Sequence, residues 1–330
     1  MANELTQLVL PHPLVLAAAV VLDLALGDPA YRWHPVRLIG WSLAALEGRL
    51  RRLGADGYGG GIALFLLLAT MWVAIVWAVV AGGALIAVPV GWALHLFFVY
   101  SLLALGDLVR HVWRTERAAG AGNLEGARAA IACLVGRDTA AMDTADCRRA
   151  AIESLSENLT DGFVSPVFWY AAGGLPALVV FKVVSTMDSM VGYKTPLHVR
   201  FGWCGARLDD VMNFIPARLT WVLLVAVAAV VPQYSSGKAF FVGLRQHAVL
   251  PGPNAGWSEA ATAGALQRKL VGPIHLQGRL VTDTWLGDPA DPAAGTHDDV
   301  VRAMVLVTVT GLVAAALAIG VLIVLTSPAP

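Results

Sequence analysis

The sequence predicts an all-α polytopic membrane protein with four transmembrane helices, two re-entrant or buried apolar helices, and helical cytoplasmic loops. Its 330 residues are 57% hydrophobic and only 14% charged, whereas about a quarter of the residues of a typical soluble domain are charged. No residue from Gly61 to Gly106 carries a formal charge, and one bilayer-spanning helix needs about 20 apolar residues. That stretch therefore holds two helices, and we expect a single integral membrane domain over residues 1–330.

Hydropathy places the four spans at about residues 8–26, 61–82, 88–108 and 303–325. The first lacks a preceding basic segment and is interrupted by Asp23, so we expect a retained helix rather than a cleaved signal peptide. The loop after it contains five arginines, whereas the turn near Pro89 has no charge. Because cytoplasmic loops are enriched in Arg and Lys, we expect this loop and the arginine-rich segment after the third span to face the cytoplasm.

Two further apolar segments are ambiguous. Residues 163–184 are long enough to cross a bilayer but contain Pro166, the pair Gly173–Gly174, and Lys182, which favour a kinked or re-entrant helix. Residues 219–231 are short for a span. We expect both to be half-inserted, which keeps the polar segments 112–162 and 185–302, with most of the active site, on one side of the membrane. Within the first polar segment, Gly136 is expected to stop one helix, Thr144 to cap the next, and Gly162 to close it.

Several function classes are disfavoured. The formal net charge is zero and no basic stripe is present, so nucleic acid is not an expected partner. The three cysteines, Cys133, Cys147 and Cys204, form no CxxC pair, which fits neither a zinc site nor a disulfide framework. The glycine-rich stretch at residues 57–61 is not followed by Lys-Ser or Lys-Thr, so the phosphate-binding P-loop is absent.

Acidic residues gather beside the apolar segments. Glu153, Glu157 and Asp161 are spaced i, i+4, i+8, which places three carboxylates on one helix face. A solvated surface is the ordinary explanation for such a row. Next to a membrane-embedded segment, however, ionisable groups are costly and more often functional.

A second acidic group, Asp209 and Asp210, precedes the apolar segment at residue 219, and Asp188 and Lys194 lie between the two groups. Mg²⁺ prefers oxygen ligands and usually takes one or two carboxylates together with water and substrate phosphates. The pattern therefore suggests magnesium and phosphate, although helix capping or a snorkelling lysine would also produce it. Arg207 offers a planar guanidinium suited to phosphate.

Asp28, His34 and Arg37 lie where the first span should emerge. They would bind an anion or anchor the helix end. No second histidine stands at ligand spacing, so the sequence does not favour a metal role for His34.

Six stretches taken together resemble the adenosylcobinamide-phosphate synthase family of cobalamin biosynthesis. They occur in order as LDLALGDPAYRWHPVRLIG, ARAAIACLVGRDTAAMD, AAIESLSENLTDGFVSPVFWYAAGGLP, TMDSMVGYKT, ARLDDVMNFIPARLT and PNAGWSEAATAGAL. The resemblance implies an ATP-dependent ligase that joins the corrinoid adenosylcobyric acid to (R)-1-amino-2-propanol O-phosphate, or to ethanolamine phosphate, with Mg²⁺ and ATP. Ser185 and Gly252 depart from the asparagine and serine usual in that family.

The resemblance also suggests roles for residues. The expected catalytic residues are Glu153, Glu157, Asp188, Lys194 and Arg207. The expected substrate-binding residues are Asp28, His34, Arg37, Arg137, Asp138, Asn158 and Asn254. The expected metal ligands are Asp161, Asp209 and Asp210.

Two alternatives stay open. Two acidic motifs on membrane helices also suit a magnesium-dependent membrane prenyltransferase, although more spans would be expected. A non-catalytic membrane sensor of the same fold would not need carboxylates concentrated beside a bilayer. The expected partners are the two substrates, the lipid bilayer, and either a second copy of the chain or other late cobalamin-assembly enzymes.

Overall fold

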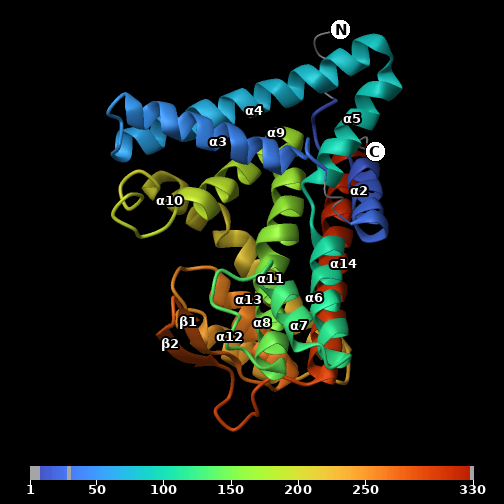
Figure 1. The fold of residues 1–330 in the computed structure, drawn as a ribbon. Coiled ribbons are helices and arrows are strands. Elements are labelled where there is room, and N and C mark those ends of the chain that lie inside the picture. Colours follow the sequence, from blue (N-terminus) through green and yellow to red (C-terminus); the bar gives the residue numbers. More distant parts are fainter. Residues whose placement is uncertain (1–7, 28–30, 328–330) are drawn as a thin grey trace. The chain divides into compact units, whose positions relative to one another are not determined.

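The computed structural model describes residues 8–27 and 31–327, and its secondary structure is mostly helical (Figure 1). The helices of its first half are α2 (Pro13–Leu26), α3 (Pro35–Arg52), α4 (Tyr58–Ile86), α5 (Val88–Ser101), α6 (Leu105–Gly120), α7 (Leu124–Ile131) and α8 (Thr144–Asn158). They are followed by the π-helix η1 (Leu159–Val164), α9 (Ser165–Val191), α10 (Trp203–Met212), α11 (Phe214–Val230), α12 (Ser236–Gln246), α13 (Ala255–Leu266) and α14 (His297–Thr326). A hairpin of β1 (Leu270–Leu276) and β2 (Arg279–Leu286) precedes α14.

Four helical stretches are long and apolar enough to cross a membrane, as expected for a multi-pass membrane protein. They are Tyr58–Ile86, Val88–Gly120, Thr144–Val191 and His297–Thr326. The pair α10 and α11, bent by 41°, would make a fifth. Four spans were predicted and four such stretches are found, but they are not the same four. α2 has only 14 residues, too few for a span, whereas residues 163–184, expected to be half-inserted, belong to a stretch long enough to cross.

Helix α9 is broken where the sequence predicted an interruption. Gly173 and Gly174 have non-helical dihedral angles, and Gly174 has φ of 67°. A Cβ on Gly174 would lie 2.3 Å from the carbonyl oxygen of Val9, and that oxygen accepts a hydrogen bond of 2.9 Å from Leu175 N. The glycine therefore lets the backbone before α2 approach α9 closely.

The ends of α8 differ from the prediction. Its N-cap is Asp143 rather than Thr144, because Asp143 and Asp146 form a capping box. Gly136 does not end the preceding helix, since α7 stops at Ile131. Gly162 does not close α8 either, because the chain continues through η1 into α9. A π-turn has more residues per turn than an α-helix, so Asp161 does not extend the straight row begun by Glu153 and Glu157.

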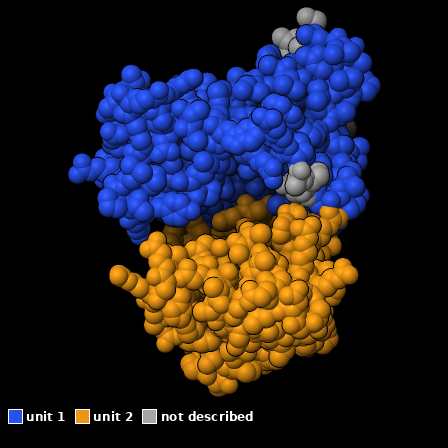
Figure 2. Space-filling model, viewed as in Figure 1, with its two compact units in different colours: residues 1–104, 165–213, 315–330 blue, residues 105–164, 214–314 orange. Residues whose placement is uncertain are grey.

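The chain forms two compact units (Figure 2). Unit 1 contains residues 1–104, 165–213 and 315–330, and unit 2 contains residues 105–164 and 214–314. In unit 1 the fully buried Leu16, Leu43, Leu64 and Leu68 form part of the core.

Unit 2 is held together by buried charges as well as by apolar packing. Glu116 on α6 is 2% exposed and accepts hydrogen bonds of 2.7 and 2.8 Å from Arg148 on α8. Asp299 at the start of α14 is fully buried and accepts a hydrogen bond of 2.7 Å from Arg268. Removal of one partner of such a pair would leave a buried charge uncompensated, which is strongly destabilising.

Candidate active site

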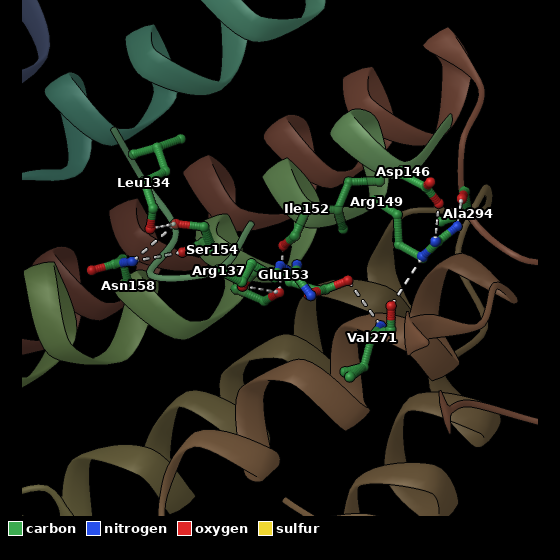
Figure 3. Close-up of polar contacts among 11 residues, drawn as sticks. Leu134, Arg137, Asp146, Arg149, Ile152, Glu153, Ser154, Asn158, Val271 and Ala294 are labelled. Carbon is green, nitrogen blue, oxygen red and sulfur yellow. Dashed lines mark hydrogen bonds and ion pairs between the residues drawn. The ribbon is translucent and has the colours of Figure 1, made fainter. Parts of the chain in front are cut away.

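Glu153 lies at the centre of a polar group in unit 2 (Figure 3). One of its carboxylate oxygens pairs with the guanidinium of Arg137, from the loop between α7 and α8. The other accepts a hydrogen bond of 3.0 Å from the backbone N–H of Val271 on β1. Both charged side chains are 10% exposed. The helix, the loop and the hairpin are therefore joined through one carboxylate.

The backbone of Val271 is held in an unusual conformation at this junction. Its φ is 69°, a value that is rare for a β-branched residue and that stores strain. Its N–H donates to Glu153, and its carbonyl oxygen accepts a hydrogen bond of 3.0 Å from Arg149 Nε. Figure 3 shows Arg149 also reaching Asp146 and the carbonyl of Ala294. Two residues one turn apart on α8 thus fix the strained residue.

A cavity of about 440 Å³ opens beside this group within unit 2. Its polar lining includes Arg137, Glu153, Glu157 and Glu259. The apolar part of its lining consists mainly of Leu134, Val135, Leu250, Pro251, Ala255 and Ile274. We call it the larger cavity. An apolar lining with a few charged groups is typical of a ligand site.

Glu259 on α13 is a site residue that the sequence analysis missed. It is 6% exposed, and burial raises its pKa well above the usual carboxyl range, with the negative charges of Glu157 and Glu153 adding to the effect. A single carboxylate has no spacing pattern. The available signal was composition, because Glu259 is the only charged residue in a helix of mostly small residues from Ala255 to Leu266.

A smaller cavity of about 260 Å³ adjoins the larger one, and the two share Arg137, Glu153 and Val271. Its lining also includes Asp138 and His275. Asp138 accepts a hydrogen bond of 2.7 Å from Gly278 N, and its own N–H donates to His275 O at 3.0 Å. The structure thus places Arg137 and Asp138, both expected to bind substrate, in cavity walls.

The second predicted acidic group lies in unit 1. Asp188 on α9 and the pair Asp209 and Asp210 on α10 are close enough for their charges to repel, and the charge of Lys182 acts on Asp209. Asn213 donates to Asp209 at 3.0 Å. Arg207 pairs with Asp210 at 3.2 Å. Lys194 is exposed after α9 and makes no ion pair with the residues that the structure describes.

The other predicted site residues that the structure describes lie on α8, before α13 and at the start of α3. Asn158 donates back to Ser154 O at 2.9 Å within α8. Asn254 precedes α13 and accepts from Arg218 at 3.5 Å. His34 is buried at the start of α3 and Arg37 is exposed on its first turn. Asp28 lies outside the described residues.

The expected metal ligands are divided between the two units. Asp161 belongs to unit 2, whereas Asp209 and Asp210 belong to unit 1. Within residues 8–27 and 31–327, no group of three or more His, Cys, Asp or Glu side chains is placed to hold a metal ion. The donor set of Asp188 and Asp209 nonetheless suits Mg²⁺, which needs only one or two carboxylates when phosphates and water complete its shell.

Comparison with known proteins finds relatives over nearly the whole chain. The sequence model of a family described as CobD/Cbib protein matches residues 16–324. A cobalamin biosynthesis protein CobD from Pelobacter propionicus is 41% identical over 279 residues, 84% of this chain and 86% of that protein. A CobD protein from Klebsiella pneumoniae is 37% identical over 307 residues, 92% of this chain and 95% of that protein. A cobalamin biosynthesis protein CbiB from Salmonella choleraesuis is 36% identical over 303 residues, 91% of this chain and 94% of that protein. No solved structure matches the chain.

Proposed function

This chain belongs to the CobD/CbiB family, and we propose that it is the amide ligase of cobalamin biosynthesis that makes adenosylcobinamide phosphate. Its substrates would be adenosylcobyric acid, ATP, and either (R)-1-amino-2-propanol O-phosphate or ethanolamine phosphate. The observation that carries the proposal is the larger cavity, where carboxylates from α8 and α13 stand beside the guanidinium of Arg137. Such a site suits a small substrate that carries both an amine and a phosphate.

The chemistry requires an activated carboxylate, because a carboxylate and an amine do not condense readily in water. An oxygen of the corrinoid carboxylate attacks the γ-phosphorus of ATP, which gives an acyl phosphate and ADP. The amine nitrogen then attacks the acyl carbon, its proton passes to a base, and inorganic phosphate leaves. Exposed cations such as Lys194 and Arg207 would stabilise the charge that develops on the transferred phosphoryl group.

Magnesium fits the carboxylates of unit 1. Asp188 and Asp209 would hold it, with Asp210 beside them and paired to Arg207. The bound ion would neutralise the charge of the ATP phosphates. In this assignment Asp161 is left as a neighbour of Glu259 rather than a ligand of the same ion.

The alternatives are less well supported. A prenyltransferase would not be expected to share a family with relatives named for cobalamin biosynthesis. A sensor without catalysis would have no need for a buried carboxylate such as Glu259 in a cavity wall, because a neutral residue there would be more stable.

The proposal includes the position of the reaction in the cell. The arginine-rich segment between α2 and α4, which includes α3, would face the cytoplasm of a bacterial inner membrane. Association with a second copy or with other late cobalamin-assembly enzymes would keep the large corrinoid at the membrane surface.

Purified protein in lipid nanodiscs tests the proposal directly. Adenosylcobyric acid, ATP, Mg²⁺ and each aminoalkyl phosphate should give the corresponding amide and ADP in equal amounts, identified by mass spectrometry. Omission of ATP should prevent product formation, and isoprenoid diphosphates should not be consumed. Consumption of an isoprenoid diphosphate without amide formation would contradict the ligase function and support the prenyltransferase function.

A further inference from the structure

Glu259 is a buried carboxylate without a hydrogen-bond partner among residues 8–27 and 31–327. It is 6% exposed and lies in the wall of the larger cavity, yet no donor from the described chain bonds or pairs with it. Glu153 contrasts with it, because both oxygens of that carboxylate are engaged. A buried carboxylate left in this state destabilises the fold. Its position therefore suggests that a ligand, rather than the protein, supplies the donor.

A second polar group in the same wall is also incompletely satisfied. Arg137 pairs through Nη2 with Glu153, but its Nε is buried and has no hydrogen-bond partner in the described part of the chain. The larger cavity therefore presents an unused acceptor, Glu259, and the guanidinium of Arg137, one of whose N–H groups has no partner in the described chain. Glu157 lies in the same wall, exposed to the cavity. A carboxylate and a guanidinium in one cavity wall are complementary to a ligand that itself carries both charges.

We propose that the larger cavity binds an aminoalkyl phosphate, with its ammonium group against Glu259 and Glu157 and its phosphate against Arg137. This inference rests on the proposed function, which requires such a substrate, and deepens it by assigning the place where that substrate binds. The ammonium satisfies the buried acceptor, and the phosphate oxygens accept from the guanidinium of Arg137.

The size of the cavity favours this ligand over the corrinoid substrate. Its volume of about 440 Å³ accommodates a chain of two or three carbons with a phosphate at one end. A corrin macrocycle with its amide side chains is far larger than this space. A divalent cation would be drawn to the carboxylates but repelled by the guanidinium of Arg137 in the same wall. A zwitterionic ligand is attracted by both, because its ammonium group faces the carboxylates and its phosphate faces the guanidinium.

Calorimetric titration of the full-length protein in nanodiscs tests the assignment without relying on turnover. The probes are ethanolamine phosphate, (R)-1-amino-2-propanol O-phosphate, ethyl phosphate, which lacks the amine, and Mg²⁺ alone. Glu259→Gln keeps the size of the side chain but loses its charge, and we expect it to weaken binding of the tighter aminoalkyl phosphate by about 10-fold or more, the usual scale for losing one charged hydrogen bond. Binding of ethyl phosphate should not change.

Glu125→Gln is the matched control, because Glu125 is exposed on α7 and pairs with Arg128; it should leave every affinity at the wild-type value. Glu157→Gln provides a second variant and should weaken the same ligand. Unchanged binding of both aminoalkyl phosphates by Glu259→Gln would overturn the assignment, as would a wild-type protein that binds neither of them. A loss of Mg²⁺ affinity alone in Glu259→Gln would also overturn it and make the carboxylate a cation ligand.

The same experiments distinguish a failure of the proposed function from a failure of the binding assignment. If the wild-type protein binds the aminoalkyl phosphate through Glu259 but forms no amide with ATP and the corrinoid, the binding assignment stands and the ligase does not. If the protein forms the amide while Glu259→Gln binds the amine substrate normally, the ligase stands and the binding assignment does not.

Discussion

Two glutamates of the larger cavity differ in what surrounds their carboxylates. Glu153 is neutralised by Arg137 and accepts the Val271 N–H, so its role is at least partly to hold the hairpin and the loop to α8. Glu259 is equally buried but has no such partners in the described chain. The first residue positions other groups, and the second is free to meet a ligand.

We expect Glu259→Gln to stabilise the ligand-free protein increasingly as pH rises. Because burial raises the pKa of Glu259, the folded chain holds its proton more tightly than the unfolded chain. As pH rises above the usual carboxyl pKa of about 4.3, only the unfolded chain ionises at first, so wild-type stability falls until the pKa of the folded state is passed. The Tm advantage of the variant should therefore grow by a few degrees between pH 5 and pH 8, measured without Mg²⁺.

The exposed Glu125→Gln should show no such growth, because Glu125 lies at the protein surface. A constant Tm difference for Glu259→Gln across this pH range would mean that Glu259 is as easily ionised in the fold as in the unfolded chain.

We expect Asp209→Ala to abolish product formation while the protein stays folded and inserted. Asp209 faces the charges of Asp188 and Asp210, and removal of a metal ligand changes metal occupancy more than helix packing. Asp298→Ala, at an exposed position near the start of α14, is the control. If mass spectrometry shows that Asp209→Ala forms product as fast as the wild type, the cluster is only a solvated helix end.

We expect Lys194→Met to lower kcat by roughly 100-fold or more, the usual scale for losing one preorganised electrostatic contact. Corrinoid affinity should change far less, because the ammonium acts where charge develops during phosphoryl transfer. Single-turnover ADP release separates the two effects. Lys238→Met is the control, since Lys238 already pairs with Asp291 at 2.6 Å. Normal ADP release by Lys194→Met would exclude Lys194 from carboxylate activation.

At the scale of elements, the sequence predicted what hydropathy and helix breakers determine locally. The break at Gly173–Gly174 in α9 was foreseen because glycine pairs interrupt helices, and the apolar stretches of α4, α5 and α14 have a distinctive composition. The π-turn η1 was missed because nothing in LTDGFV distinguishes it from an ordinary α-helical turn. Glu259 was missed because its proximity to α8 arises from tertiary packing.

The hairpin of β1 and β2 was also missed, since the polar segments were expected to be helical. Its local signal was the dipeptide Gln277–Gly278, whose φ values of 52° and 72° are those of the tight turns that join antiparallel strands. The hairpin contributes Val271, Pro273 and His275 to the cavity walls, so part of the site depends on an element that helical periodicity does not predict.

We expect Gly174→Ala to destabilise unit 1. The new Cβ would stand 2.3 Å from the Val9 carbonyl oxygen at a positive φ, and the left-handed conformation alone is disfavoured by about 1–2 kcal/mol for an L-residue. Gly82→Ala in α4 is the matched control, because nothing lies within 4 Å of its Cβ, and it should be neutral or slightly stabilising. Equal thermal unfolding of the two variants would show that the approach of Val9 to α9 does not support the fold.

At the scale of the whole molecule, membrane topology follows from where the arginines lie. A cysteine at Gly57, before α4, should be labelled only from the cytoplasmic side, and one at Ala87, after α4, only from the other side, because α4 is 29 residues long. A cysteine at the exposed Ala140 should be labelled like Gly57→Cys. The exposed native Cys133 must first be replaced. Labelling of residues 57 and 140 from opposite sides would refute the cytoplasmic assignment of both segments.

The shared wall of the two cavities has a thermodynamic consequence. Arg137 and Glu153 line both spaces, so an anion that engages the guanidinium from one cavity withdraws it, in part, from the carboxylate and changes the field in the other. Occupancies that act on one ion pair are not independent, and their coupling is reciprocal: each ligand alters the affinity of the other by the same factor. Ligands that occupy the two cavities together will therefore bind either cooperatively or antagonistically.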